Sequence, residues 1–200
     1  MNEFDIWRQK YESMTYEEQI EYHNDIERRF PEQAHYTYGN VKYALNMAGE
    51  NLRVLEFGCW KADMAERALL EHSISDWKGI EICTSAIEKT RCINPKFSYI
   101  HPNDFNWFET TERPECDIIL ATHFIEHLSN PHFESLAKYC KGAKWIYFEA
   151  PLLDVDREWD GYVGTHKLNY GWNNIIGIMS QKGYELVNKF PEGILLKYVV

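Results

Sequence analysis

Four acidic or histidine side chains follow apolar runs in this sequence, at positions that suit a ligand-binding edge. Glu56 lies near the end of LRVLEF, Glu81 near the end of WKGIEI, and His123 ends CDIILATH, while Asp104 comes shortly after FSYIH. Carboxylates accept hydrogen bonds from hydroxyl and ammonium groups, and histidine exchanges protons near neutral pH. Any one of these residues alone could be a helix cap or a solvated turn residue. Together, and in this order, they predict a site for a polar small molecule.

The elements that must position these residues alternate between strand and helix. Strands are predicted over 52–57, 77–82, 97–101, 116–123, 143–150, 184–190 and 194–200, and helices over 62–72, 85–92, 130–141 and 171–182. Repeated strand–helix–strand units imply a parallel sheet with right-handed crossovers, and the short last connection suits an antiparallel hairpin. The predicted fold class is α/β: a doubly wound, mostly parallel seven-stranded sheet with a terminal antiparallel hairpin. Ligands of such sheets bind outside the strand carboxyl ends.

The first fifty residues are polar and helical, without a strand signal, and are predicted to be an N-terminal helical extension. Thr15 and Glu18 form a capping-box pattern at the start of a helix that Pro31 stops. A second short helix is predicted over about 38–47.

We expect this extension, residues 1–50, to form a lid over the ligand cleft of the Rossmann-like domain at 51–200. Tyr36, Tyr38 and Asn40 would then face the cleft. The alternative is a helix that packs as a plain cap on the outer face of the sheet.

Composition limits the partners. The chain has 200 residues, a formal net charge of −10 and five scattered cysteines, none in a C-x-x-C pair. The acidic balance argues against nucleic acid, because phosphate-backbone binding depends on Lys and Arg. The sequence has neither a long apolar run nor a signal-peptide pattern, and its cysteines suit reduced thiols. We expect a cytoplasmic protein with a small-molecule partner, no membrane or nucleic-acid partner, and an oligomeric state that stays open.

The motifs VLEFGC, GIEI, NDF and DIILATHFIEHLSNP resemble, in order and spacing, those of class I S-adenosylmethionine-dependent methyltransferases. They are most similar to the group typified by the ubiquinone and menaquinone biosynthesis enzymes, as is HKLNYGWNNIIGIMSQKGYEL. The resemblance covers about residues 50–200 and departs from the family pattern E/D-x-G-x-G-x-G at Trp60 and Ala62. A dinucleotide pyrophosphate needs bare backbone around it, so the missing glycines argue more against NAD than against S-adenosylmethionine.

The resemblance implies a role for each strand-end residue. Glu56 would orient the methionine end of S-adenosylmethionine, and Glu81 would bind its ribose hydroxyls. Further cofactor contacts would come from Gly58, Cys59, Ile82, Asp104, Phe105 and His123.

The predicted function is methyl transfer from S-adenosylmethionine to an oxygen nucleophile of a small-molecule acceptor. Such transfer chiefly requires alignment of the nucleophile, assisted by a base that removes its proton. Candidate bases are His123 and His166, the latter in a long aromatic and acidic loop after the fifth strand. Tyr170, Trp172 and Tyr38 would contribute to the acceptor pocket.

Three other interpretations compete with this function. The fold could serve a non-catalytic ligand- or partner-binding protein, and an NAD dehydrogenase is a more distant alternative. HFIEH, residues 123–127, also fits the H-x-x-E-H pattern of a zinc-protease group. Those ligands need a sustained helix, whereas this motif straddles the end of the predicted strand 116–123 and is cut off by Pro131. No metal is therefore expected.

Overall fold

The protein is described by a computed structural model that covers residues 13–15, 17, 18, 21, 31–90, 92–102, 107, 111–152 and 168–199, with the backbone alone for 31–36 and 85. Its strands are β1 (Leu52–Phe57), β2 (Ile74–Ile80), β3 (Phe97–Ile100), β4 (Ile118–Thr122), β5 (Trp145–Glu149), β6 (Tyr184–Phe190) and β7 (Gly193–Tyr198). Its helices are α3 (Pro31–Ala48), α4 (Asp63–Glu71), α5 (Thr84–Glu88), η1 (Ile125–His127, a 3-10 turn), α7 (Asn130–Cys140) and α8 (Trp172–Ser180).

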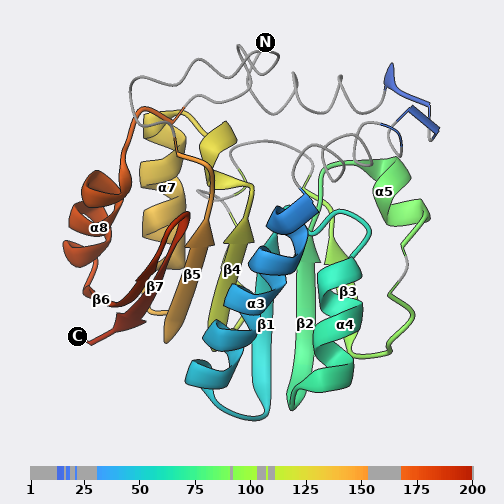
Figure 1. Ribbon diagram of the computed structural model, residues 1–200, viewed down its shortest axis with the longest axis horizontal. Helices are drawn as coiled ribbons and strands as arrows, with labels where there is room; N and C mark the ends of the chain where they lie inside the picture. Colours follow the sequence, from blue (N-terminus) through green and yellow to red (C-terminus); the bar gives the residue numbers. More distant parts are fainter. Residues whose placement is uncertain are drawn as a thin grey trace.

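The seven strands form one sheet in the order β3-β2-β1-β4-β5-β7-β6 (Figure 1). The five strands from β3 to β5 are parallel, and β7 is antiparallel to both β5 and β6. The predicted fold class is therefore confirmed. Because the chain runs outward from the centre in both directions, strand order reverses between β1 and β4, the usual position of a ligand in such sheets.

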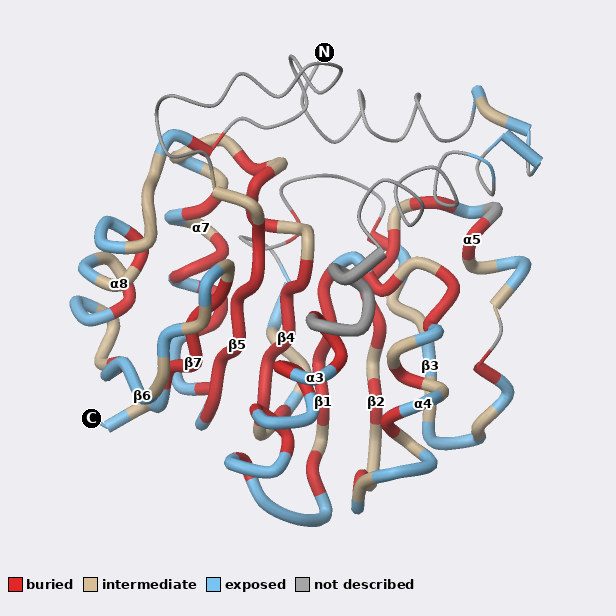
Figure 2. The backbone as a smooth tube through the Cα atoms, viewed as in Figure 1, coloured by how far each residue is buried: buried red, intermediate tan, exposed pale blue. Residues whose placement is uncertain are grey.

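Alternation along the strands divides the core into two layers. Leu55 and Phe57 of β1 pack with α7 and α8, whereas Leu52 and Val54 pack with α3 and α4. Buried residues run along the central strands (Figure 2). By the same alternation, Glu56 at the end of β1 lies on the side of α3 and α4.

Helix boundaries differ from the prediction at two places. Helix α3 begins at Pro31, so this proline opens a helix, since its fixed φ and missing N–H suit the first turn. Helix α5 begins at Thr84, with Cys83 as its N-cap residue, and ends at Glu88, so the predicted extension to residue 92 is wrong. Strand β2 is also shifted, beginning at Ile74 and ending at Ile80.

The N-terminal segment contributes both a local motif and a core helix. Thr15 and Glu18 form the predicted capping box, with reciprocal backbone-to-side-chain hydrogen bonds of 2.6 and 3.2 Å. In α3, Val41, Ala44 and Leu45 are fully buried against the sheet. The same helix reaches the strand carboxyl ends, where Asn40 Nδ2 donates to Glu149 Oε2 at 3.0 Å. Helix α3 thus covers a sheet face and also reaches the ligand edge.

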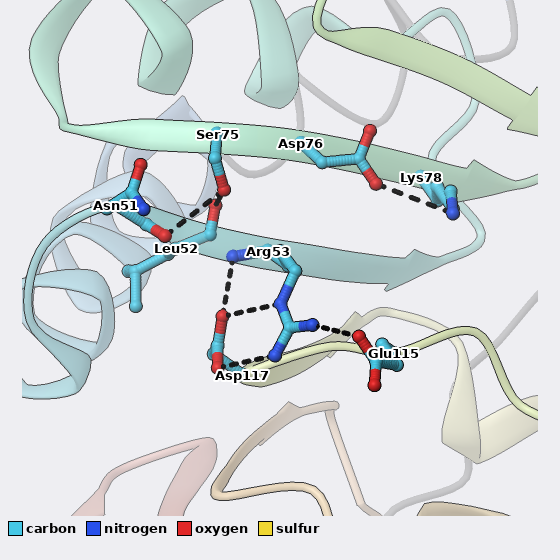
Figure 3. Close-up of polar contacts among 8 residues, drawn as sticks. All are labelled: Asn51, Leu52, Arg53, Ser75, Asp76, Lys78, Glu115 and Asp117. Atoms are coloured by element: carbon cyan, nitrogen blue, oxygen red, sulfur yellow. Dashed lines mark hydrogen bonds and ion pairs between the residues drawn. The ribbon is translucent and has the colours of Figure 1, made fainter.

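The amino ends of the strands are fixed by an ion-pair network (Figure 3). Arg53 donates to Asp117 from its backbone N–H at 2.9 Å, from Nε at 3.1 Å and from Nη2 at 3.2 Å, and it also pairs with Glu115. The Ser75 hydroxyl contacts the carbonyl oxygens of Asn51 and Leu52 at 3.1 and 3.0 Å. These contacts link β1, β2 and β4 at the end of the sheet opposite the strand carboxyl ends.

Within the described ranges, no helix is both long and apolar enough to cross a membrane.

Candidate active site

The buried charged side chains of the described residues gather at one edge of the sheet. They belong to Glu56, Lys61, Glu81, Glu126 and Glu149, none more than 6% exposed. Each lies at, or a few residues after, the carboxyl end of β1, β2, β4 or β5. Burying an ionisable group is costly unless it is paired or serves a ligand. Their concentration therefore marks this edge as the functional one.

Glu56 provides a buried carboxyl group near the carboxyl end of β1. Trp77 Nε1 donates to its Oε2 at 3.0 Å. Burial raises the pKa of Glu56 to about 8, opposed by the Trp77 hydrogen bond and increased further by Glu81. The group is therefore mostly neutral at pH 7, and a ligand ammonium beside it would favour the charged form.

Glu81 ties together the loops that follow β1 and β2. Its Oε2 accepts the backbone N–H of Trp60, and its Oε1 accepts those of Ile82 and Cys83, all at 2.8 Å. Burial nevertheless raises the pKa of this carboxyl group. A carboxylate offers about four lone-pair sites, so Glu81 keeps acceptor capacity for a ligand hydroxyl.

The loop after β1 keeps a glycine-like backbone at the positions where glycine is missing. Gly58, Trp60 and Ala62 have φ of 70°, 48° and 61°, and these are the three glycine positions of the family pattern. The Trp60 backbone is held on both sides, its N–H by Glu81 and its carbonyl oxygen by the Tyr99 hydroxyl at 2.9 Å. The substitutions therefore change the side chains of the loop but retain left-handed backbone at those positions.

This geometry predicts an unusual order of stability for two variants. Trp60→Gly and Trp60→Ala both remove the indole, but only glycine adopts φ near 48° without strain. We expect the glycine variant to be the more stable by about 1 kcal/mol. Urea unfolding of both proteins measures this difference. An alanine variant as stable as the glycine variant would show that the loop relaxes out of the left-handed region.

Cys59 fits against β2 at a point where only glycine is tolerated. A Cβ atom built on Gly79 would lie 2.4 Å from Cys59 Sγ and 3.0 Å from the Phe97 ring. Burial and the neighbouring carboxyl groups of Glu56 and Glu81 raise the pKa of the Cys59 thiol well above its usual value. Cys59 is thus a packing residue, with its backbone at the edge. All five cysteines are buried free thiols.

His123 lies between two carboxyl groups just beyond β4. Its Nδ1 is 3.6 Å from Glu126 Oε1, and its Nε2 is 3.9 Å from Glu149 Oε1. Burial lowers the pKa of His123, but Glu126 and Glu149 outweigh this effect and raise the pKa overall. About a third of the side chain, 36%, is exposed, so a ligand can reach the ring.

Glu126 has unused hydrogen-bonding capacity. Burial would raise its pKa, but the nearby His127 and His123 lower it overall. His127 Nε2 is 3.8 Å from Glu126 Oε1, and Oε2 has no hydrogen-bond partner in the described part of the chain. A buried, ionised oxygen of this kind calls for a water or ligand donor.

Sequence reasoning missed Glu126, Glu149 and Tyr147 as site residues. Glu149 ends β5, much as Glu56 nearly ends β1. The strand-end signal that points to Glu56 therefore also points to Glu149. Its Oε2 accepts hydrogen bonds from Asn40 and from the Tyr147 hydroxyl. Asn40 was expected at the cleft, and it does reach this edge.

The predicted acceptor-pocket residues are not all brought together. Tyr38 packs beneath the Arg67 guanidinium, whose carbon lies 3.7 Å from the ring centre. It therefore faces α4 and is not among the residues around His123. Tyr170 donates to Glu134 Oε1 of α7 at 2.9 Å, and Trp172 begins α8, partly buried against the core.

The end of the loop after β5 returns to the site, because the Leu168 N–H donates to the Glu126 carbonyl at 3.3 Å. Several predicted site residues lie outside the described residues, namely His166, Asp104 and Phe105. The same holds for most of the predicted lid before Pro31, apart from the short capping region around Thr15 and Glu18. Among the residues that are described, no three His, Cys, Asp or Glu side chains are grouped to hold a metal ion. The H-x-x-E-H stretch forms only the single turn η1.

Fold and site together define a Rossmann-like α/β enzyme with a ligand edge rich in carboxyl groups. A family model described as "Methyltransferase domain" matches residues 27–185. The chain belongs to this family and is a class I S-adenosylmethionine-dependent methyltransferase. No curated protein sequence matches it significantly.

Solved structures share the fold at low sequence identity. Magnesium protoporphyrin IX methyltransferase from Synechocystis PCC 6803 with bound S-adenosylmethionine has a TM-score of 0.73 and 10% identity, covering 100% of this chain and 98% of that one. An S-adenosylmethionine-dependent methyltransferase from Archaeoglobus fulgidus has a TM-score of 0.60 and 19% identity, covering 82% and 75%. A Haloferax volcanii complex between the Trm112 methyltransferase activator and a putative methyltransferase has a TM-score of 0.62 and 14% identity, covering 96% and 80%.

Proposed function

We propose that this methyltransferase acts on an oxygen atom of a small-molecule acceptor, in the cytoplasm. The observation that carries the proposal is His123, a partly exposed histidine set between two buried carboxyl groups at the end of β4. An oxygen nucleophile must lose a proton as it attacks, and a base near neutral pH suits that step.

The residues at β1 and β2 fit the cofactor. S-adenosylmethionine supplies an activated methyl group when bound. Glu56 would hold its ammonium group and Glu81 its ribose hydroxyls, since both carboxyl groups are buried at the strand ends and have acceptor capacity. The other proposed contacts are Gly58, Cys59, Ile82, Asp104, Phe105 and His123.

His123 would take the hydroxyl proton of the methyl acceptor on its Nε2 atom. The 3.9 Å to Glu149 exceeds hydrogen-bond length, so this nitrogen is free to meet an acceptor hydroxyl. Glu126 faces the other nitrogen and favours the imidazolium that forms. His166 is the second proposed base.

The residues proposed to contact the methyl acceptor support a small, polar substrate. Tyr170 and Trp172 come shortly after Leu168, whose backbone N–H donates to the Glu126 carbonyl oxygen. Aromatic rings with carboxylates suit polyhydroxylated or cationic molecules. The net charge of −10 opposes a nucleic-acid acceptor.

The proposal is tested with methyl-labelled S-adenosylmethionine and a panel of hydroxylated, amine and carbon acceptors, with RNA included. We expect label on the oxygen of a hydroxylated small molecule, at a rate that rises with pH through a midpoint above 6.5, because the pKa of His123 is raised. His123→Gln should lose transfer, while calorimetry should show cofactor binding that is at most weakened, because the proposed contacts of Glu56 and Glu81 remain. Label on RNA, nitrogen or carbon, or unimpaired transfer by the variant, would refute the corresponding part.

A further inference from the structure

Glu149 connects α3, β5 and the turn after β4 beside His123, where the methyl acceptor is proposed to bind. Its Oε2 accepts from Asn40 Nδ2 of α3 at 3.0 Å and from the Tyr147 hydroxyl of β5. Its Oε1 faces His123 Nε2 at 3.9 Å, and its backbone carbonyl accepts the His123 N–H at 2.8 Å. One oxygen is therefore fixed by two donors, while the other is directed at the histidine.

We propose that Asn40 and Tyr147 are positioning residues that hold the Glu149 carboxylate against His123, so that helix α3 forms part of the active site. The proposal rests on the proposed function in placing His123 at the point of methyl transfer. A glutamate side chain has several rotatable bonds, and two hydrogen bonds to one oxygen from two different elements restrict them.

A purely structural role explains this arrangement less well. Glu149 is 1% exposed and Asn40 is 8% exposed, and apolar residues of similar size would pack there without the cost of burying a carboxylate. The remaining faces of α3 and β5 do use apolar residues, including Val41, Leu45 and Phe148.

The titration of His123 reports on this carboxylate. The acidic groups facing the ring come from three elements: Glu126 from η1, Glu149 from β5, and Glu192 from the turn between β6 and β7. Burial lowers the pKa of His123, and these three groups raise it. His127 Nε2 also lies 3.8 Å from Glu126 Oε1, so the NMR signal of His127 is followed in the same experiment.

The test is an NMR titration of His123 in the full chain without cofactor, with its signal among the eight histidines assigned by its loss in His123→Gln. We expect Glu149→Gln to lower the His123 midpoint by about one pH unit. Asn40→Ala should move the midpoint by roughly 0.3 unit or more in the parent protein, but not in the Glu149→Gln background. Glu185→Gln, an exposed change on β6, is the control and should leave the midpoint unchanged.

The non-additivity separates positioning from packing. If Asn40→Ala lowers only the melting temperature, or moves the midpoint equally in both backgrounds, Asn40 does not act through Glu149 and the proposal is wrong. An unchanged midpoint in Glu149→Gln also overturns it. Should Asn40→Ala fail to fold, Tyr147→Phe is put through the same cycle, because it removes one hydroxyl and keeps the ring packed on Phe190. Because no cofactor or acceptor is needed, failure here is distinct from failure of the labelling experiment.

Discussion

Glu56→Gln should stabilise the folded protein by about 3 kcal/mol at pH 7 and at the same time weaken its binding of S-adenosylmethionine. The burial of Glu56 raises its pKa from 4.5 to about 8. Between these pH values the unfolded chain has lost a proton that the folded chain retains, so parent stability falls as pH rises, by about 1.4 kcal/mol per unit. Glutamine stays neutral and keeps an oxygen for the Trp77 indole N–H.

Urea unfolding at pH 4.5, 6, 7 and 8 measures this effect. The two proteins should be nearly equal at pH 4.5 and should diverge steadily up to pH 8, with Glu185→Gln following the parent throughout. A difference that does not change with pH would mean that Glu56 is ionised in the folded protein. Calorimetry should show a roughly tenfold to hundredfold loss of cofactor affinity, the contribution of a charged hydrogen bond. It should also show proton release on cofactor binding by the parent alone.

Glu81→Ala should lower both cofactor affinity and stability in the absence of cofactor. Three backbone N–H groups, from Trp60, Ile82 and Cys83, lose their acceptor, and each buried donor left unsatisfied costs about 1–3 kcal/mol. We therefore expect a loss of about 3 kcal/mol or more in the free energy of unfolding. Cofactor affinity should fall by a further 1.5–3 kcal/mol, or roughly tenfold to a hundredfold.

The two effects of Glu81→Ala are measured separately. Denaturant unfolding without cofactor reports on the loops, and calorimetry at a temperature where both proteins are folded reports on the ribose contact. Glu88→Ala, an exposed change at the end of α5, provides the matched control. Unchanged affinity would exclude the ribose assignment, whereas unchanged stability would show that the loops do not depend on this carboxylate.

Sequence alone predicts the strand ends well, because a buried apolar run that stops at an acid or histidine is a local signal. Glu56, Glu81 and His123 follow from it. The left-handed backbone at Trp60 and Ala62 does not, since neither residue type favours that conformation. At Trp60 this backbone is held by contacts with Glu81 and with Tyr99, which are distant in sequence.

Helix faces were harder to assign than strand ends. The direction of Tyr38 depends on where α4 lies, and only the folded arrangement shows that Arg67 covers the ring. Pro31 can either stop or begin a helix, so the full extent of α3 could not be derived from local pattern. Glu149 carries the same strand-end signal as Glu56, but its contacts with Asn40 and His123 emerge only in the folded arrangement.

The position of β7 between β5 and β6 makes the terminal hairpin part of the wall beside Glu149. Among the described strands β6 pairs with β7 alone, so the two form a hairpin that is connected to the rest of the sheet through β7. Its docking register places Gly193 opposite Glu149, and a Cβ atom on Gly193 would lie 3.0 Å from both the Phe148 carbonyl oxygen and the Tyr147 hydroxyl. The docked hairpin thus covers both Tyr147 and Glu149. Detachment of the hairpin would expose the edge of β5 and uncover Tyr147 and Glu149, so the integrity of the terminal hairpin and the integrity of this part of the site depend on each other.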